Sequence, residues 1–308
     1  MESTLAYSQS QFDLVLAAFV MALFALFGTF VYLLATRSEI SPRFRPSGMA
    51  GAVICLIAAM AYLLLTASWL TGFDFDPGSK TLSSSDSVLQ FRNGYRYVDW
   101  VVTVPLLAVE LIAISALSGL RASRTRVIAM ALAVGMVVTG FLGEDTFRSD
   151  GGRLLWGLIS TAFFIPLYLL LLRTAFASAA EIGGAAGTNI KRAGIMLSWT
   201  WGVYPIVYCY PFLFDSAGWA VAAQLAFTVA DISAKVGFGF FIHYAAKART
   251  ATDVSQGESP HPEASYSAGV KVAEAQPVEL GRRTTYADQG ATLGGDHATR
   301  PVPEHAGR

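Results

Sequence analysis

The stretch LVLAAFVMALFALFGTFVYLLA, residues 14–35, is predominantly apolar and contains no charged side chain. An α-helix needs about 20 such residues to cross the hydrocarbon core of a bilayer. A backbone in lipid must satisfy its hydrogen bonds within its own segment, so the stretch predicts a membrane-spanning helix. The residues before it include Glu2 and no basic group, which argues against a cleaved signal peptide.

Six further apolar runs follow within the first 249 residues. Together with the first, they lie at residues 14–35, 49–69, 100–117, 127–142, 154–172, 193–214 and 218–246. Most reach the length of a membrane span, and the fourth is the shortest. The sequence therefore predicts an all-α membrane protein, a bundle of seven transmembrane helices.

The composition of the whole chain agrees with this fold. Hydrophobic residues make up 54% of the 308 residues and charged residues 14%, whereas soluble domains carry roughly 25% charged residues. The 22 basic and 22 acidic residues balance, so the chain lacks the basic footprint of a nucleic-acid-binding protein. The cysteines and histidines show no ligand spacing, and we expect no metal site.

Charges in the connections between the runs predict the orientation. Basic residues mark the first, third and fifth connections: Arg37, Arg43, Arg45, Arg121, Arg124, Arg126, Arg173, Lys191 and Arg192. Acidic residues mark the other three: Asp74, Asp76, Asp86, Glu144, Asp145, Asp150 and Asp215. By the positive-inside rule, the N-terminus lies outside and the C-terminus inside.

The chain divides by composition at residue 249. Residues 1–249 form the predicted seven-helix domain. Residues 250–308 are rich in Ala, Gly, Glu, Thr and Pro and show no periodicity, which predicts a disordered cytoplasmic tail. Between the second and third runs, Asp76-Pro77-Gly78 followed by residues 81–91 predicts a turn and a hairpin on the outer face.

Five charged side chains lie at membrane depth on only two of the predicted helices. The third helix carries Arg96, Asp99 and Glu110, and the seventh carries Asp231 and Lys235. A charge inside a span is costly unless it is paired, so each of these residues is a functional candidate. Asp231 and Lys235 share a helix face because they are four residues apart.

The two carboxyl groups of the third helix are expected at different depths. Asp99 and Glu110 face nearly the same way and are separated by roughly 16 Å along the helix axis. A purely structural alternative pairs Arg96 with Asp99 and Lys235 with Asp231 to tie the two helices together. That pairing leaves Glu110 alone in apolar surroundings, where burial favours its neutral form. A proton reservoir needs such a protonated acid.

These residues resemble the microbial rhodopsins. The motifs that carry the resemblance are RYVDW (96–100), TVPLL (103–107) with Glu110, Met136 with Thr139-Gly140, Trp156 with Ser160-Thr161, WGVYP (201–205) and DISAK (231–235). They occur in the order found in the family, and the similarity covers residues 11–249. The resemblance implies all-trans retinal bound covalently, as a Schiff base, at Lys235.

The resemblance also assigns roles to the other charged residues. It implies Asp99 as counter-ion and proton acceptor, Asp231 as second counter-ion and Glu110 as proton donor. Arg96 would act as an electrostatic gate on the extracellular side. Asp, Thr and Glu at 99, 103 and 110 are typical of outward proton pumps of the proteorhodopsin and xanthorhodopsin type. We expect the Thr103 hydroxyl to bond either to the Asp99 carboxylate or to a backbone carbonyl.

The walls of the retinal site follow from the same resemblance. The residues implied are Trp100, Leu107, Met136, Gly140, Trp156, Ser160, Trp201, Tyr204 and Pro205. Rigid aromatic walls suit a flat apolar ligand, although aromatic packing in a helix bundle is the alternative interpretation. Leu107 lies where the family tunes its colour, and an apolar residue there implies green absorption.

Two positions need separate interpretation. Ala61 stands where many relatives carry a second-helix histidine that pairs with the acceptor. Gly157 follows Trp156, and in xanthorhodopsin-like pumps a glycine here opens a lateral window for a carotenoid antenna. The alternative for Gly157 is close helix contact, which small residues allow in membranes.

The resemblance implies a light-driven outward proton pump, not an enzyme, in the plasma membrane of a bacterium. Its partners would be membrane lipid, protons and further copies, because relatives form trimers to pentamers. The alternative is a sensory rhodopsin that signals to a partner protein; Glu110 argues against it, since a sensor needs no carboxylic donor. A receptor without retinal leaves Lys235 and Asp99 unexplained.

Overall fold

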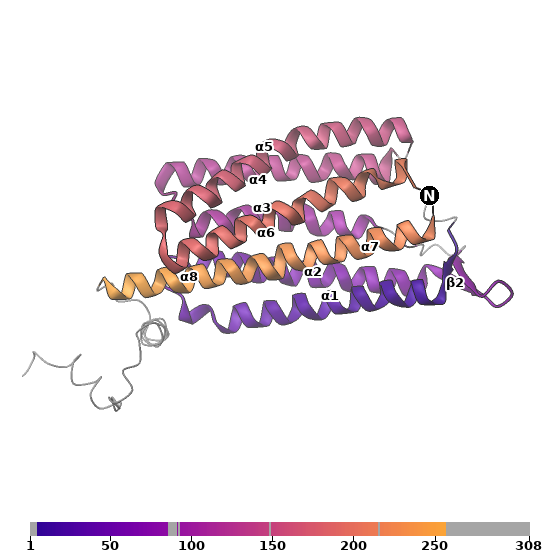
Figure 1. Ribbon diagram of the computed structural model, residues 1–308, viewed down its shortest axis with the longest axis horizontal. Helices are drawn as coiled ribbons and strands as arrows, with labels where there is room; N and C mark the ends of the chain where they lie inside the picture. Colours follow the sequence, from indigo (N-terminus) through magenta and orange to yellow (C-terminus); the bar gives the residue numbers. More distant parts are fainter. Residues whose placement is uncertain (1–4, 86–90, 92, 148, 215, 257–308) are drawn as a thin grey trace, which may run out of the picture. The chain divides into compact units, whose positions relative to one another are not determined.

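The computed structural model describes residues 5–85, 91, 93–147, 149–214 and 216–256. Within these residues the chain forms long helices that lie side by side in a bundle (Figure 1). The first six are α1 (Gln9–Ala35), α2 (Arg45–Thr71), α3 (Gly94–Ile114), α4 (Gly119–Phe141), α5 (Asp150–Ile182) and α6 (Gly184–Cys209). The seventh is continuous through α7 (Ala217–Ile232), a π-helical turn (Ser233–Gly237) and α8 (Phe238–Ser255).

The helices account for the seven expected spans. Six helical stretches of the described chain are long and apolar enough to cross a membrane, and α6 is the remaining long helix. The fourth run, the shortest by sequence, belongs to a full helix of 23 residues. The third span was expected at 100–117, but α3 begins at Gly94 and ends at Ile114, because Ser115 takes an extended conformation. Its start was missed because polar residues of its first turns are buried in the bundle.

A small sheet covers one end of the bundle, which we call the hairpin end. Strands β2 (Phe73–Asp76) and β3 (Thr81–Ser84) pair antiparallel around the predicted turn, and β1 (Tyr7–Ser8) adds to the other edge of β3. The hairpin was expected to extend to residue 91, but residues 86–90 lie outside the described residues. In the turn, the Ser79 hydroxyl and the Gly78 N–H donate to Asp76 at 2.7 and 2.9 Å. These bonds hold the pKa of the Asp76 carboxyl below its usual range.

The opposite end, which we call the α8 end, is tied together by α8. This helix continues to Ser255, past residue 249 where a disordered tail was expected to begin. Its last turns are anchored, since the Ser41 N–H donates to Thr250 Oγ1 at 3.0 Å and Arg249 donates to the carbonyl of Ile114 at 2.8 Å. The rest of the expected tail, residues 257–308, lies outside the described residues.

Candidate functional site

Lys235 lies in the middle of the bundle at an irregular point of the seventh helix. The π-helical turn Ser233–Gly237 contains it, and such turns are frequent at functional sites. The side chain is 2% exposed. Its Nζ donates to Asp99 Oδ2 at 2.7 Å and to Asp231 Oδ1 at 2.8 Å. One buried cation therefore stands between two carboxylates from two helices.

Asp231 is saturated with hydrogen bonds. Its described donors are Tyr62 Oη (2.9 Å) and Arg96 Nη1 (3.1 Å) on Oδ2, and Trp100 Nε1 (3.1 Å), Tyr204 Oη (2.9 Å) and Lys235 Nζ (2.8 Å) on Oδ1. Hydrogen bonds donated to a carboxylate favour its charged form. Because protonation of Asp231 would break at least one of these bonds, the arrangement suits a permanently ionised group.

Asp99 is hydrogen-bonded very differently. Its Oδ2 accepts from Lys235, but Oδ1 is buried and has no hydrogen-bond partner among the described residues. A proton placed on Oδ1 would break none of the hydrogen bonds between described groups. The two carboxylates beside Lys235 are therefore unequal, and Asp99 is the one equipped to accept a proton.

Arg96 forms an ion pair with Asp231, whereas the purely structural interpretation of the sequence paired it with Asp99. Its Nη1 lies 3.1 Å from Asp231 Oδ2, and this ion pair replaces the expected pair with Asp99. Nη1 also donates to Tyr62 Oη at 2.9 Å, and Nη2 donates to Gln224 Oε1 at 3.0 Å. Arg96 lies one turn nearer the hairpin end than Asp99. From there its guanidinium reaches across to Asp231 and Gln224 on α7.

Thr103 fulfils the second of its two expected bonding modes. Its hydroxyl donates to the backbone carbonyl of Asp99 at 3.0 Å, one turn earlier on α3. The side chain is fully buried. Thr103 thus fixes the local helix geometry next to Asp99, in the second of the two bonding modes that the sequence left open.

Glu110 lies apart from the other charges, toward the α8 end. It is 1% exposed, and none of the described charged side chains forms an ion pair with it. Gly51 of α2 makes room for it: a Cβ there would stand 2.8 Å from Glu110 Oε1. An isolated carboxylate in such surroundings is costly, so the pocket favours the neutral acid. The sequence-based expectation of a lone buried acid is confirmed.

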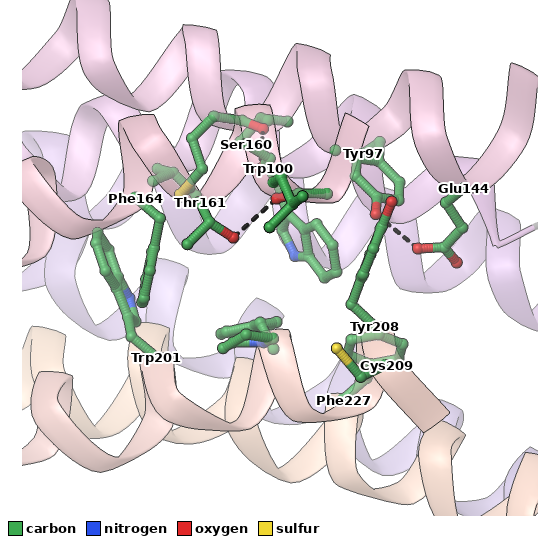
Figure 2. A pocket seen from close by; sticks show the side chains of 18 of the residues that line it. Tyr97, Trp100, Glu144, Ser160, Thr161, Phe164, Trp201, Tyr208, Cys209 and Phe227 are labelled. Atoms are coloured by element: carbon green, nitrogen blue, oxygen red, sulfur yellow. Dashed lines mark hydrogen bonds between the residues drawn. The ribbon is translucent and has the colours of Figure 1, made fainter. Parts of the chain in front are cut away.

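A cavity of about 210 Å³ extends from Lys235 between α3, α4, α5, α6 and α7. The predicted wall residues that line it are Trp100, Leu107, Met136, Gly140, Ser160, Trp201, Tyr204 and Pro205. Figure 2 shows Phe164 and Trp201 side by side at one end of it and Tyr97, Tyr208 and Glu144 toward the other. The walls are largely apolar and aromatic, which fits a flat hydrocarbon ligand that reacts with the Lys235 amine.

Trp156, which was predicted as a wall residue, does not line this cavity. Its ring stacks on Phe147 with centroids 5.7 Å apart and planes at 13°. Phe164, two turns further along α5, lines the cavity, and its ring centroid lies 6.3 Å from that of Trp201. Sequence reasoning missed Phe164 because an apolar ring in an apolar helix carries no distinguishing signal.

Gly157 lines the cavity, but its contact is with a neighbouring side chain. A Cβ at this position would come within 2.7 Å of Tyr208 Cε1 on α6. The glycine therefore allows close packing of α5 and α6, which is the alternative interpretation. A carotenoid beside it stays a prediction from the resemblance.

Two polar residues of the site were missed by sequence reasoning. Tyr62 follows Ala61, the position of the absent histidine, and its hydroxyl bridges Arg96 and Asp231. Gln224 lies two helical turns before Asp231 and bonds to Arg96. The signal for Gln224 was available, because an amide seven residues before a buried aspartate shares its helix face.

Comparison with known proteins identifies the family. Residues 14–249 match the sequence model described as "Bacteriorhodopsin-like protein". The chain belongs to this family. The predicted membership of the microbial rhodopsins is confirmed, and so is the seven-helix rhodopsin fold.

Individual relatives are distant. Archaerhodopsin-3 of Halorubrum sodomense is 33% identical over 187 residues, 58% of this chain and 64% of that protein. Archaerhodopsin-2 of Halobacterium sp. (strain aus-2) is 29% identical over 173 residues, 55% of this chain and 61% of that protein. Green-light absorbing proteorhodopsin of Gamma-proteobacterium EBAC31A08 is 23% identical over 219 residues, 71% and 80% of the two chains. The chain spans less than two thirds of the length of these archaerhodopsins.

Solved structures match over more of the bacteriorhodopsin-like domain. Xanthorhodopsin, whose structure is described as that of a light-driven ion pump with dual chromophore, superposes with a TM-score of 0.72 and 31% identity. The match covers 79% of this chain and 96% of xanthorhodopsin. A thermophilic rhodopsin gives the same TM-score at 26% identity, covering 80% and 97% of the two chains.

Proposed function

We propose that this protein is a light-driven outward proton pump with all-trans retinal attached to Lys235. The observation that carries the proposal is the inequality of the two carboxylates beside Lys235. Asp231 accepts five described hydrogen bonds, whereas Asp99 keeps an oxygen to which no described group donates. When bound, retinal supplies the absorption of visible light and a light-driven isomerisation.

The residues of the site divide the proton transfer between them. Lys235 Nζ holds the proton and Asp99 receives it across a contact of 2.7 Å. The transfer converts a cation and an anion into two neutral groups. The buried site keeps the same net charge because the proton moves within it, and Asp231 and Arg96 remain an ion pair.

Glu110 is assigned to the return of the proton. It lies on the same helix as Asp99, roughly 16 Å nearer the α8 end by helix geometry. As a neutral acid it gives its proton to Lys235 Nζ and then takes another from the solution at that end. Donor and acceptor on opposite sides of Lys235 give the transport its direction.

We further propose how the protein sits in the membrane. The hairpin end faces outward and the α8 end faces the cytoplasm, because the basic connections lie at the α8 end. The membrane is the plasma membrane of a bacterium. Exposed apolar side chains along α5, among them Leu154, Leu155 and Leu158, suit contact with lipid or with further copies in a trimer to pentamer.

The proposal is tested by illuminating cells that contain the protein in unbuffered medium. We expect the medium to acidify in the light and the acidification to vanish with a protonophore. Coloured cells that produce no pH change would contradict pumping and would favour the sensory alternative.

Glu110→Gln should slow the recovery of the dark state. The amide keeps the size of the side chain but has no acidic proton to give, so reprotonation of Lys235 Nζ should slow by roughly 100-fold. The recovery is followed by flash absorption spectroscopy. Glu181→Gln, at an exposed acid near the end of α5, is the matched control. Equal recovery in both variants would remove Glu110 from the donor role.

Leu107→Gln should move the absorption maximum to shorter wavelength. Leu107 is 3% exposed and lines the cavity, so the introduced amide would place a dipole against the bound chromophore. Spectra of the purified variants measure the shift. Leu107→Met keeps the position apolar and should leave the maximum nearly unchanged; a blue shift of the same size in both would contradict the assignment.

A further inference from the structure

A chain of hydrogen bonds leads from the counter-ion site to an acid at the hairpin end. Arg96 Nη2 donates to Gln224 Oε1 at 3.0 Å, and Gln224 Nε2 donates to Asn93 Oδ1 at 3.2 Å. Asn93 Nδ2 in turn donates to Glu144 Oε1 at 3.1 Å. The two amides are oriented head to tail, so the chain has a cation at one end and a carboxylate at the other.

Glu144 is held by side chains from α3, from α5 and from the residue before α3. It lies in the π-helical turn Leu142–Thr146 that follows α4. Besides the bond from Asn93, its Oε2 accepts from Tyr97 Oη at 2.6 Å and lies 4.0 Å from Arg153 Nη2 of α5. Figure 2 shows Tyr97 and Glu144 pointing toward each other beside the cavity. All of these partners are donors, so the arrangement suits an ionised carboxylate.

Tyr97 gives Glu144 a second link to the retinal site. The Tyr97 ring lines the cavity and packs edge-on against Trp100 with centroids 5.0 Å apart. Trp100 itself donates to Asp231. Glu144 is thus connected to Asp231 through Tyr97 and Trp100 on one side and through the amides and Arg96 on the other.

The two ends of this network differ in their access to solvent. The side chains of Arg96 and Asp231 are each 1% exposed, whereas those of Glu144 and Arg153 are 14% and 15% exposed. The Glu144 end of the network is therefore in contact with the solution, whereas the Arg96 end is not. The mechanism proposed above does not use this residue.

We propose that Glu144 is a positioning residue for Arg96, which it holds through Asn93 and Gln224. The anion at the far end of the amide chain draws the guanidinium away from the carboxylates beside Lys235. The charged and titratable groups that face the network are Tyr62, Tyr97, Asp99, Arg153, Tyr204, Tyr208, Asp231 and Lys235.

The direction of the effect follows from two contributions with the same sign. Removal of the Glu144 charge takes a negative charge away from the site. It also allows the Arg96 guanidinium to interact more strongly with the Asp231 and Asp99 carboxylates. Both changes favour the ionised acceptor, so stronger acid is needed to protonate it. In a medium of effective dielectric constant near 20, the loss of one charge at this long range corresponds to a change of roughly half to one pH unit.

The test is an acid titration of the full-length pigment reconstituted with all-trans retinal. We expect Glu144→Gln to move the midpoint of the acid-induced colour change to lower pH by roughly half to one unit. Glu144→Asp keeps the charge and should restore most of the original midpoint. Asp145→Asn, in the same turn, removes an equal charge outside the amide chain and should move the midpoint clearly less than Glu144→Gln does.

A second variant keeps the inference testable if Glu144→Gln forms no pigment. Asn93→Ala cuts the amide chain but leaves the Glu144 charge, so it should move the midpoint in the same direction by a smaller amount. A pigment in which neither variant moves the midpoint overturns the positioning role. The inference rests on the proposed function, but the two fail separately: a wild-type pigment that pumps protons, with a midpoint that neither variant moves, refutes the positioning role alone.

Discussion

Lys235→Ala is expected to abolish formation of the pigment. Lys235 Nζ is the amine that lines the aromatic cavity, and a methyl group cannot form the covalent bond to retinal. Purified protein is incubated with all-trans retinal and its visible spectrum recorded. The wild-type chain should become coloured and the variant should stay colourless. Lys191→Ala, at an exposed lysine on α6, should become coloured like the wild type.

The alanine variant also removes the cation that two buried carboxylates share, which costs roughly 3–5 kcal/mol of stability. Lys235→Arg separates this effect from the chemistry. A guanidinium keeps the positive charge between Asp99 and Asp231 but does not condense with an aldehyde, so this variant should fold and remain colourless. A visible band in either variant at position 235 would show that retinal is attached elsewhere.

Asp99→Asn is expected to abolish light-driven proton transport while colour is retained. The amide has the size of the carboxylate but cannot take the proton from Lys235, and transport should fall by at least roughly 100-fold. Asp231, 2.8 Å from Nζ, still supplies a counter-charge for the pigment. The light-induced pH change, scaled to the amount of pigment, measures the loss. Transport at the wild-type rate would refute the acceptor role.

Asp231→Asn makes the same chemical change at the other carboxylate, but we expect its main defect to be a less stable pigment and not a loss of the proton acceptor. Its five donors include Arg96, Tyr62 and Tyr204, and an amide accepts on one atom only. We expect faster thermal bleaching of the pigment as the main defect, measured by the decay of the visible band on heating. Equal bleaching rates in the two asparagine variants would contradict the division of roles.

The bundle was predictable because the bilayer leaves few choices. An apolar run such as residues 14–35 must be a helix in lipid, and a charge inside such a run must have a partner or a function. These two constraints led directly to Asp99, Glu110 and Lys235. The helix ends were less accessible, since the first turns of α3 are polar by sequence and buried in the structure.

Contacts between helices were the part that sequence could not supply. The partner of Arg96 depends on whether its side chain reaches α7, and the stacking of Trp156 on Phe147 depends on the course of the chain after α4. Glu144 looked like one of several loop acids, because its bonds to Asn93 and Tyr97 join residues that are about 50 positions apart. Spacing rules within one helix carry no information about such pairs.

The central claim is that the proton of Lys235 moves to Asp99 when the protein absorbs light. Time-resolved infrared spectroscopy after a laser flash tests it most directly, with visible absorption recorded on the same sample. We predict that a protonated-carboxyl band grows with the same time constant as the visible change that marks loss of the Nζ proton, and that the band is missing in Asp99→Asn. Loss of the Nζ proton in the wild type while the Asp99 carboxylate stays ionised would contradict the account.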